Sequence, residues 1–180
     1  MQIKTLLIVS LILLPLLSGW ASADAESCEN LWGGSQSSSD LSSETLKPEH
    51  VRLCLPLRFI PEPREDGVVF RDPSDTNGSR GRIGLAIATD SKYAYSDVME
   101  EYERLKITLC QLSNVTAGTL CSVTKIQGKL YVALKGLQVG VYSEAFIHVG
   151  KGYMLALTAE APDSAAYLVL RTVLQSAVIP

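Results

Sequence analysis

Alternating apolar and polar positions dominate the C-terminal part of the chain. Apolar residues alternate with polar or small ones from Leu137 to Val149, reach the segment Gly150-Lys151-Gly152, and alternate again from Tyr153 to Ala159. Period-two alternation on both sides of a glycine-bracketed turn is typical of a β-hairpin with one face on a core. The pattern therefore predicts a hairpin here, with its turn at residues 150–152.

Two stretches have helical periodicity instead. Between Val98 and Leu112, apolar residues recur at i, i+4, i+7, i+11 and i+14, which places them on one side of a helix. Ser96-Asp97 is the predicted N-cap of this helix. A second helix is predicted from Asp163 to Gln175, and the chain ends in an apolar segment, 177–179, predicted to be the last strand.

Shorter alternating runs predict the remaining strands. Val51–Arg58 is the predicted first strand, although Pro56 places it at an edge or ends it early. Pro61–Asp66 is predicted to be a solvated loop, and Asp72–Arg82, rich in Asp, Asn, Gly and Ser, a long hairpin connection. Further strands are predicted at residues 68–70, 83–87, 122–126 and 130–134. Strands interrupted by two helices predict an α+β fold, an antiparallel sheet with helices packed on it.

The N-terminus has the features of a secretory signal. Lys4 supplies the positive charge, Leu6–Leu17 is an apolar run, and Ala21-Ser22-Ala23 is a small-x-small cleavage site. The run is short for a transmembrane helix, so an uncleaved anchor is the less favoured alternative. Residues 1–23 are therefore the predicted signal peptide, residues 24–49 a flexible Ser/Gly-rich leader, and residues 50–180 a single α+β domain. We expect a periplasmic or secreted protein.

Charge limits the classes of partner. The 180 residues carry a net charge of −3, with neither a basic cluster nor a basic amphipathic helix. Nucleic acid is therefore not an expected partner, and no stable membrane insertion is expected after removal of the signal. The expected partner is another protein.

The chain contains four cysteines, Cys28, Cys54, Cys110 and Cys121. An even number in an oxidising compartment favours disulfides over free thiols. Three connectivities are possible. We favour Cys110–Cys121, which closes a short loop at a helix end, and Cys28–Cys54, which ties the N-terminal segment to the first strand. Zinc binding is the alternative, weakened because no C-x-x-C pair occurs.

Three segments carry a resemblance to a known family. They are the opening strand that runs into a proline (Leu53–Pro56), a middle strand with its glycine (Val123–Gly128), and the closing unit of strand, acid-capped helix and Ser-containing tail (Tyr153–Ser176). Together they resemble the Mog1/PsbP-like α/β/α sandwich, in particular its exported bacterial members of the DcrB type, over residues 50–180. The resemblance implies non-catalytic work, the binding of a protein partner or support of assembly, and it supplies no catalytic motif.

Candidate catalytic and metal-binding residues are few. His50 and His148 are each expected at the surface rather than beside a nucleophile. Asp72–Gly78 superficially resembles a calcium loop, but Pro73 and Gly84 would then occupy positions that need carboxylates. No catalytic residue, metal site or cofactor is therefore predicted.

Two segments fit the N-glycosylation pattern, which matters only in a eukaryotic host: Asn77-Gly78-Ser79 and Asn114-Val115-Thr116.

Two polar loops, Pro61–Gly67 and Asp72–Arg82, flank the same predicted hairpin and are expected to form one end of the sheet. Binding residues concentrate on such loops, and Arg is enriched at binding hot spots. The alternative is that both are ordinary solubilising loops. The predicted partner-binding residues are Arg64, Arg71, Arg80 and Arg82.

The sequence thus predicts a non-catalytic, exported protein-binding domain that serves envelope assembly or partner recognition. One alternative is an immunity protein that neutralises a cell-wall- or lipid-degrading toxin. An alternative from another class is a small hydrolase or a metal-dependent enzyme.

Overall fold

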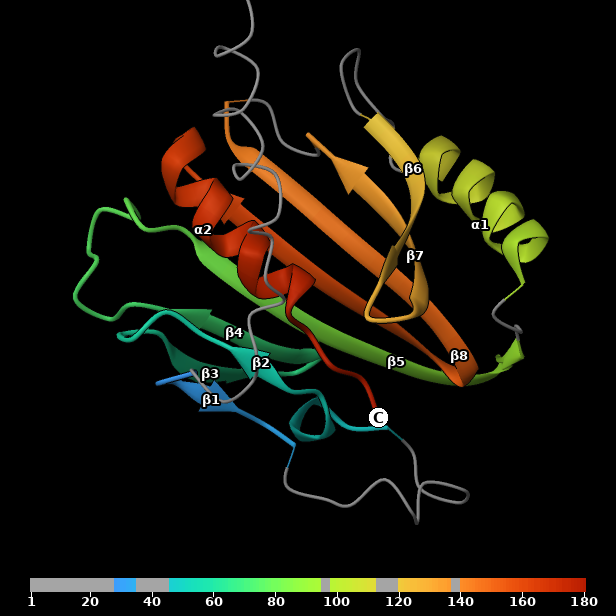
Figure 1. Ribbon diagram of the computed structural model, residues 1–180, viewed down its shortest axis with the longest axis horizontal. Helices are drawn as coiled ribbons and strands as arrows, with labels where there is room; N and C mark the ends of the chain where they lie inside the picture. The colour runs from blue at the N-terminus through green and yellow to red at the C-terminus, as the bar shows by residue number, and fades with distance from the viewer. Residues whose placement is uncertain (1–27, 35–45, 95–97, 113–119, 137–139) are drawn as a thin grey trace, which may run out of the picture.

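An antiparallel sheet of six strands forms the centre of the molecule, in the order β3-β4-β5-β8-β7-β6 (Figure 1). The computed structural model describes residues 28–34, 46–94, 98–112, 120–136 and 140–180. Two helices pack on this sheet, so the predicted α+β class is confirmed. In sheet order the strands are β3 (Ile60–Arg64), β4 (Gly67–Arg71), β5 (Arg82–Ala94), β8 (Tyr142–Ala161), β7 (Lys129–Lys135) and β6 (Leu120–Ile126).

The two helices cover opposite faces of the sheet and different parts of it. Helix α2 (Ser164–Gln175) packs along β8 and buries Tyr167, Leu170 and Leu174 against the larger core cluster (Figure 1). Helix α1 (Met99–Leu112) packs on β6 and β7, where Tyr102 lies among Val132 and other residues of a smaller cluster. The face opposite α2 is therefore covered over β6 and β7 by α1.

The predicted N-terminus of α2 is confirmed. Asp163 has an extended backbone, and its Oδ1 accepts hydrogen bonds from the backbone N–H groups of Ala165 and Ala166, each at 2.9 Å. A capping carboxylate satisfies donors that have no partner within the helix and complements the helix dipole. The predicted cap of α1, Ser96-Asp97, lies outside the described residues.

The predicted hairpin between residues 137 and 159 is wrong, because residues 142–161 form the single long strand β8. Its first half pairs with β7 and its second half with β5. Phe146 belongs to the core cluster beneath α2, and so do Leu155 and Leu157, so the inward positions change from even to odd numbers. Gly152, with φ +82°, lies where this change occurs. Between the pairs Thr89–Tyr153 and Ala94–Lys151, four residues of β5 lie opposite Gly152 alone, so the irregularity is a β-bulge in the β5–β8 ladder, with the extra residues in β5, rather than a turn.

The predicted loop at Pro61–Asp66 is also wrong over most of its length. Residues 60–64 form β3, the edge strand, in which Pro61 lies opposite Phe70 of β4. Proline lacks an N–H donor but is tolerated on an edge strand, where that donor would face away from the ladder. Only Glu65 and Asp66 form the connecting turn.

The predicted first strand is shorter than expected and lies outside the main sheet. Strand β2 (Leu53–Cys54) pairs with β1 (Leu31–Trp32), and Arg52 forms an isolated bridge with Val178 of the apolar tail. The ring of Trp32 meets that of Phe70 edge to face, 4.8 Å between centroids. This small sheet packs onto the same core as α2.

Part of the predicted flexible leader is therefore packed. Trp32 contacts the core cluster, Leu46 is buried in it, and Pro48–His50 form a 3₁₀ turn. The predicted signal peptide, and residues 24–27 and 35–45 of the leader, lie outside the described residues. Among the helices that the structure describes, none is long and apolar enough to cross a membrane.

Candidate functional site

All four arginines predicted to bind a partner are exposed, and each forms an ion pair within the chain. Arg64 and Arg71 both contact Glu62. Arg80 Nη1 lies 2.7 Å from Asp72 Oδ2, and Arg82 donates from Nε to Glu160 Oε2 at 2.7 Å. Each of these arginines is therefore paired within the chain.

Three of these arginines point to one face of the sheet, the face opposite α2. Strand register places Arg64 beside Gly67, and Ile60 beside Arg71. Phe70 lies opposite Ile83, so Arg71 and Arg82 are neighbours one step further along. Because side chains alternate between faces, these three arginines point away from the side on which Phe70 and Ile83 are buried.

Small side chains fill the centre of this face. Register aligns Val69 with Gly84 and Thr158, and Gly67 with Ala86 and Ala156. All six are partly exposed, and together they line a shallow hollow of about 150 Å³. A Cβ atom at Gly84 would lie 2.4 Å from Thr158 Oγ1, so this position favours glycine. We call these six residues the open face.

The open face differs from an ordinary solvated sheet face, on which polar side chains alternate with buried ones. Only Thr158 of its six residues carries a polar side-chain group. Charged residues lie around it on neighbouring positions: Glu62, Arg64, Arg71, Arg82 and Glu160. An apolar centre within a charged rim is the composition of a protein-binding surface.

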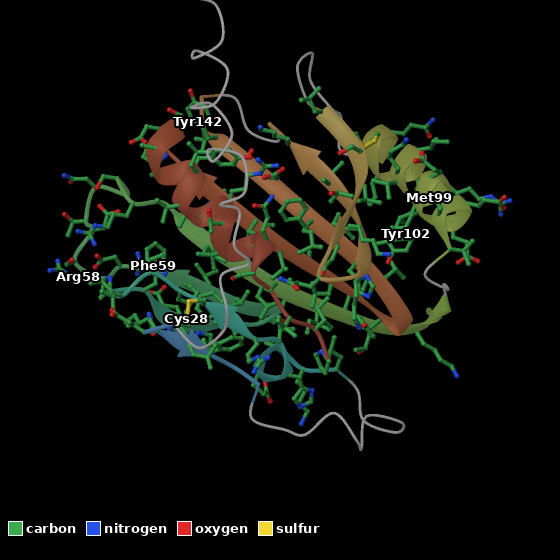
Figure 2. All side chains as sticks on the ribbon, viewed as in Figure 1. Cys28, Arg58, Phe59, Met99, Tyr102 and Tyr142 are labelled. Atoms are coloured by element: carbon green, nitrogen blue, oxygen red, sulfur yellow. A yellow bond between two sulfur atoms is a disulfide. The ribbon has the colours of Figure 1, made fainter. Side chains whose placement is uncertain are left out.

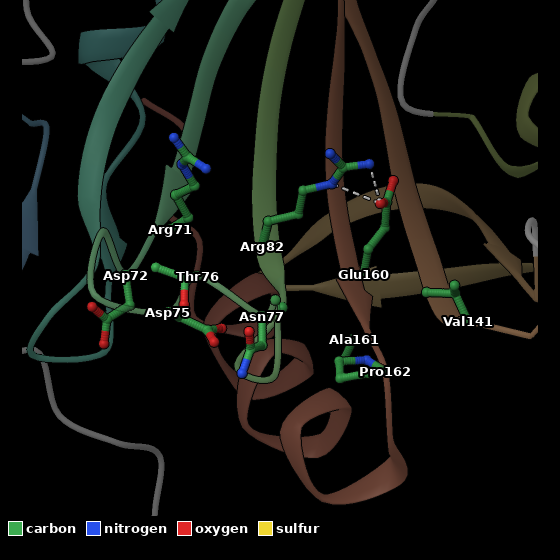
Figure 3. A pocket seen from close by; sticks show the side chains of 12 residues that line it. Arg71, Asp72, Asp75, Thr76, Asn77, Arg82, Val141, Glu160, Ala161 and Pro162 are labelled. Atoms are coloured by element: carbon green, nitrogen blue, oxygen red, sulfur yellow. Dashed lines mark hydrogen bonds and ion pairs between the residues drawn. The ribbon is translucent and has the colours of Figure 1, made fainter.

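A second hollow, of about 460 Å³, lies at the end of the sheet where β4 leads into the loop of residues 72–81 (Figure 3). Arg71, Arg82 and Glu160 line one part of it, and the ion pair of the latter two is drawn there. Asp75, Thr76 and Asn77 line the part formed by the loop. This hollow adjoins the charged end of the open face.

The loop of residues 72–81 is held by its own side chains. Asp72 Oδ1 accepts from the hydroxyl of Ser74 at 2.6 Å and from its backbone N–H at 2.9 Å, which with Arg80 lowers the pKa of Asp72. Asp75 accepts from the backbone of Arg80 and from Ser79, and these bonds lower its pKa as well. The polar side chains that predicted a hairpin connection therefore also stabilise one conformation of it.

The two predicted binding loops do not form one end of the sheet. Residues 61–64 belong to β3, and the turn at Glu65-Asp66 precedes β4, whereas residues 72–81 follow it. The turn and the loop therefore lie at opposite ends of β4. Arg71 and Arg82 come together at one end, and Arg64 is connected to Arg71 through Glu62. What these three arginines share is the sheet face opposite α2, not a cluster of loops.

A buried carboxylate that the sequence analysis did not identify lies on the α2 side of the sheet. Glu144 of β8 is 4% exposed, and its Oε2 accepts from the Tyr167 hydroxyl at 2.7 Å and lies 2.9 Å from Arg171 Nε. Burial, and then the bond to Glu144, raise the pKa of Tyr167 far above its ordinary value. A single acidic residue within an apolar strand is the signal that identifies such a site in a sequence.

Beside Glu144 is a groove of about 290 Å³, which we call the polar groove. It lies between α2 and the outer strands β6 and β7. Its lining residues are Ser122, Thr124, Lys125, Ile126, Gln127, Ala133, Glu144, Phe146, Arg171 and Gln175.

Both histidines, expected at the surface, are buried. His148 is 2% exposed; its Nδ1 lies 2.9 Å from the Tyr102 hydroxyl and 2.8 Å from the Leu130 carbonyl oxygen. His50 is 8% exposed, and its Nδ1 accepts from the backbone N–H of Lys47 at 3.2 Å. Each ring is thus engaged in the interior, where it replaces hydrogen bonds that water would otherwise make.

The four cysteines are paired as the sequence analysis favoured. Cys28 is bonded to Cys54, with Cα atoms 5.7 Å apart, and Cys110 to Cys121, with Cα atoms 6.3 Å apart. The first bridge joins the segment before β1 to β2, beside the label of Cys28 in Figure 2. The second joins α1 to β6. Among the described residues, no cluster of three or more His, Cys, Asp or Glu residues has the arrangement of a metal site.

No protein-family model matches the chain, and no curated protein matches it in sequence. Among solved structures, the chain is similar to cyanobacterial PsbP (CyanoP) from Synechocystis sp. PCC 6803, with 14% identity and a TM-score of 0.48 over 72% of this chain and 86% of that one. A protein from Bacteroides thetaiotaomicron VPI-5482 has the same identity and TM-score, over 75% of this chain and 47% of that one. The first of these two proteins, a PsbP, is of the family that the three sequence segments resemble. At this identity and TM-score, neither neighbour bears on the function of this chain.

Proposed function

We propose that this chain is a non-catalytic, exported protein that recognises another protein through its open face. The observation that carries the proposal is the composition of that face: small apolar residues in the centre, and charged residues around it. Protein-binding surfaces have this anatomy, because the apolar centre supplies most of the binding energy and the rim excludes water.

The chemistry of the face specifies the kind of partner. The rim carries three arginines paired with two carboxylates, Glu62 and Glu160, so little net charge remains and the rim does not select a strongly acidic or basic partner. Its centre is shallow and lined by small side chains, which suits a broad apolar surface rather than one inserted side chain. The partner is therefore a protein with a flat apolar patch and charges of both signs at its margin.

Export is part of the proposal, and the disulfides support it. Both bridges join elements of the folded domain, as in proteins that mature in an oxidising compartment. The engaged, buried histidines support a non-catalytic role, because neither ring is accessible to a substrate. The periplasm or the extracellular space is the proposed location.

The test is site-specific photo-crosslinking of the full-length chain in its native host. A photoreactive residue at Ala86 or Ala156, on the open face, is expected to give one crosslinked adduct with a specific protein, identified by mass spectrometry. The matched control is a photoreactive residue at Thr172, which is exposed on α2 and remote from that face. Equal crosslinking at Thr172, or none at either open-face position, would contradict the proposal.

A competing variant sharpens the test. Ala156→Arg places an unpaired charge at the centre of the interface and is expected to weaken partner binding about a hundredfold. The adduct from Ala86 should disappear in this variant. If the captured partner is a cell-wall- or lipid-degrading enzyme that the chain inhibits, the partner-recognition role is that of an immunity protein.

A further inference from the structure

The polar groove is a second site, on the opposite side of the sheet from the open face. Its floor is formed by aligned residues of three strands: Ser122 of β6 lies opposite Ala133 of β7, which lies opposite Phe146 of β8. The short side chain of Ala133 leaves the space between its larger neighbours. With about 290 Å³, the groove has room for about ten water molecules or a small polar group.

Glu144 supplies a hydrogen-bond acceptor that the chain itself leaves unused. Its side chain is 4% exposed and lines the groove. Oε2 receives the bond from Tyr167, but no described residue donates a hydrogen bond to Oε1. A carboxylate accepts about four hydrogen bonds, so Glu144 keeps acceptor capacity toward the groove that it lines. A donor on a ligand would fill that capacity.

Arg171 supplies donors beside this acceptor. Among the described residues its only ion pair is with Glu144, and Nε, although 2.9 Å from Oε2, is buried without a hydrogen bond of normal geometry. The N–H groups of its terminal nitrogens bond to no described residue. The guanidinium carries five donors in a planar fork, which suits an oxygen acceptor on a ligand.

The charges of the pair disfavour simple ions, because a cation would meet Arg171 and an anion would meet Glu144 at close range. Lys125, an exposed residue, also lines the groove, whereas the ammonium of Lys135 lies 5.3 Å above the Tyr167 ring and does not. A neutral group that donates and accepts at adjacent atoms matches Glu144 and Arg171 together.

We propose that the polar groove binds a carboxamide, the end group of a glutamine or asparagine side chain. The ligand NH₂ donates to Glu144 Oε1, and the ligand carbonyl oxygen accepts from the terminal nitrogens of Arg171. The hydroxyls of Ser122 and Thr124 bind the rest of the ligand. This site is independent of the open face, from which the sheet separates it.

The experiment is a titration of the ¹⁵N-labelled full-length chain, with its disulfides intact, followed by NMR. The first set of probes is free glutamine, glutamate, lysine and norleucine; the second is an acetylated, amidated pentapeptide with each of these as its central residue. Carboxamide probes are expected to shift the backbone signals of Ser122, Thr124 and Gln175. They should bind about tenfold more tightly than the other probes, the value of one hydrogen bond to a charged group. Binding in the first set assigns a free amide-bearing ligand, and binding in the second set alone assigns a polypeptide side chain.

Two variants and one control test the residues of the groove. Ser122→Leu fills the groove at an exposed position and should abolish the shifts without unfolding the chain. Glu144→Gln keeps the shape but removes the charge, and should weaken carboxamide binding about tenfold. Thr172→Leu, exposed on α2 outside the groove, should bind as the unmodified chain does.

Three results would overturn the proposal. They are no shift from any probe up to about 10 mM, equal binding of the carboxamide, acidic, basic and apolar probes, and shifts that map to the open face or persist in Ser122→Leu. The crosslinking test probes Ala86 and Ala156 of the open face, and the NMR titration probes the polar groove. Failure of either test therefore leaves the other proposal intact.

Discussion

Each buried ionisable side chain of the described core has a specific local reason to be there. Glu144 accepts from Tyr167, and His148 lies against Tyr102 and the Leu130 carbonyl oxygen. In the loop before β5, Asp72 is buried because Ser74 and Arg80 satisfy its oxygens. Burial of a polar group costs little when its hydrogen bonds are replaced and much when they are not.

The hydroxyl of Tyr167 should contribute measurably to stability. Tyr167→Phe removes the one hydrogen bond to Glu144 Oε2 and is expected to lower the free energy of unfolding by about 1.5–3 kcal/mol, the range for bonds to charged groups. Chemical denaturation measures the difference. Tyr142→Phe is the matched control, because Tyr142 is half exposed and no described residue bonds to its hydroxyl; equal losses in both variants would contradict this assignment.

The depressed pKa of Asp72 predicts how its contribution varies with pH. Because the carboxylate is favoured in the folded chain, its stabilisation is fully present above the ordinary pKa of 3.8 and is lost as pH falls through the lower folded value. Asp72→Asn should therefore melt at a lower temperature than the unmodified chain at pH 7. The two melting temperatures should converge as pH falls through the lowered folded pKa of Asp72. A difference that is constant with pH would show that the charge has no part in it.

At the scale of elements, β8 determines the layout. Its first half pairs with β7 and its second half with β5, so one strand connects the part of the sheet under α1 to the part bearing the open face. The bulge at Gly152 keeps the core side chains of both halves on the α2 side. A one-residue slip without the bulge would turn Leu155 and Leu157 to the opposite face.

Gly152→Ala tests the bulge. The φ of +82° disfavours any side chain, while no atom lies within 4 Å of the added Cβ, so the cost is backbone strain alone. The free energy of unfolding should fall by about 1–2 kcal/mol. Lys151→Ala, an exposed residue of the same bulge, is the control and should change it by less than about 0.5 kcal/mol. An unchanged Gly152→Ala variant would mean that the strand does not need positive φ there.

The disulfides should stabilise the elements that they join. Reduction frees the segment before β1 from β2, and α1 from β6. Each bridge is worth about 3 kcal/mol by the loop-entropy model, so reducing agent should lower the melting temperature by several degrees. Calorimetry with and without reductant gives the shift, and thiol titration of the untreated protein checks the pairing. Four reactive thiols in untreated protein would contradict it.

For the whole molecule, the sheet has one well-covered face and one that is covered only over β6 and β7 by the described helices. Substitutions of two adjacent residues of β5, one on each face, should distinguish the covered face from the open one. Leu85→Ala, on the α2 side, should cost about 2–5 kcal/mol because it leaves a cavity in the core. Ala86→Lys, on the open face, should change stability by less than about 0.5 kcal/mol. A large loss in Ala86→Lys would show that the open face is covered within the chain.

Much of the fold could be read from local patterns. The boundaries of α2, its Asp163 cap, and the strands near 68–70, 122–126 and 130–134 were predictable because caps and periodicity act between residues close in sequence. The hairpin at residues 150–152 was not, since a glycine-bracketed bulge and a turn produce the same alternation. Neither was β3, whose prolines are typical of loops and are tolerated only because the strand is at an edge.

The candidate sites divide in the same way. Sequence reasoning selected Arg64, Arg71 and Arg82 as binding residues, but from the expectation of a loop cluster; strand pairing places them instead around six small residues from three strands. Glu144 and Arg171 are 27 positions apart, and no local pattern links them.

The sequence by itself determined the type of most elements and the small negative net charge of the chain, and it favoured, without deciding, the cysteine pairing that the structure has. These properties follow from local hydrogen bonding, local chain geometry and composition. Only the tertiary structure decided which face of the sheet remains open and which polar side chains share a groove. Those depend on strand order and on a one-residue phase shift in β8, which are set by packing between distant segments.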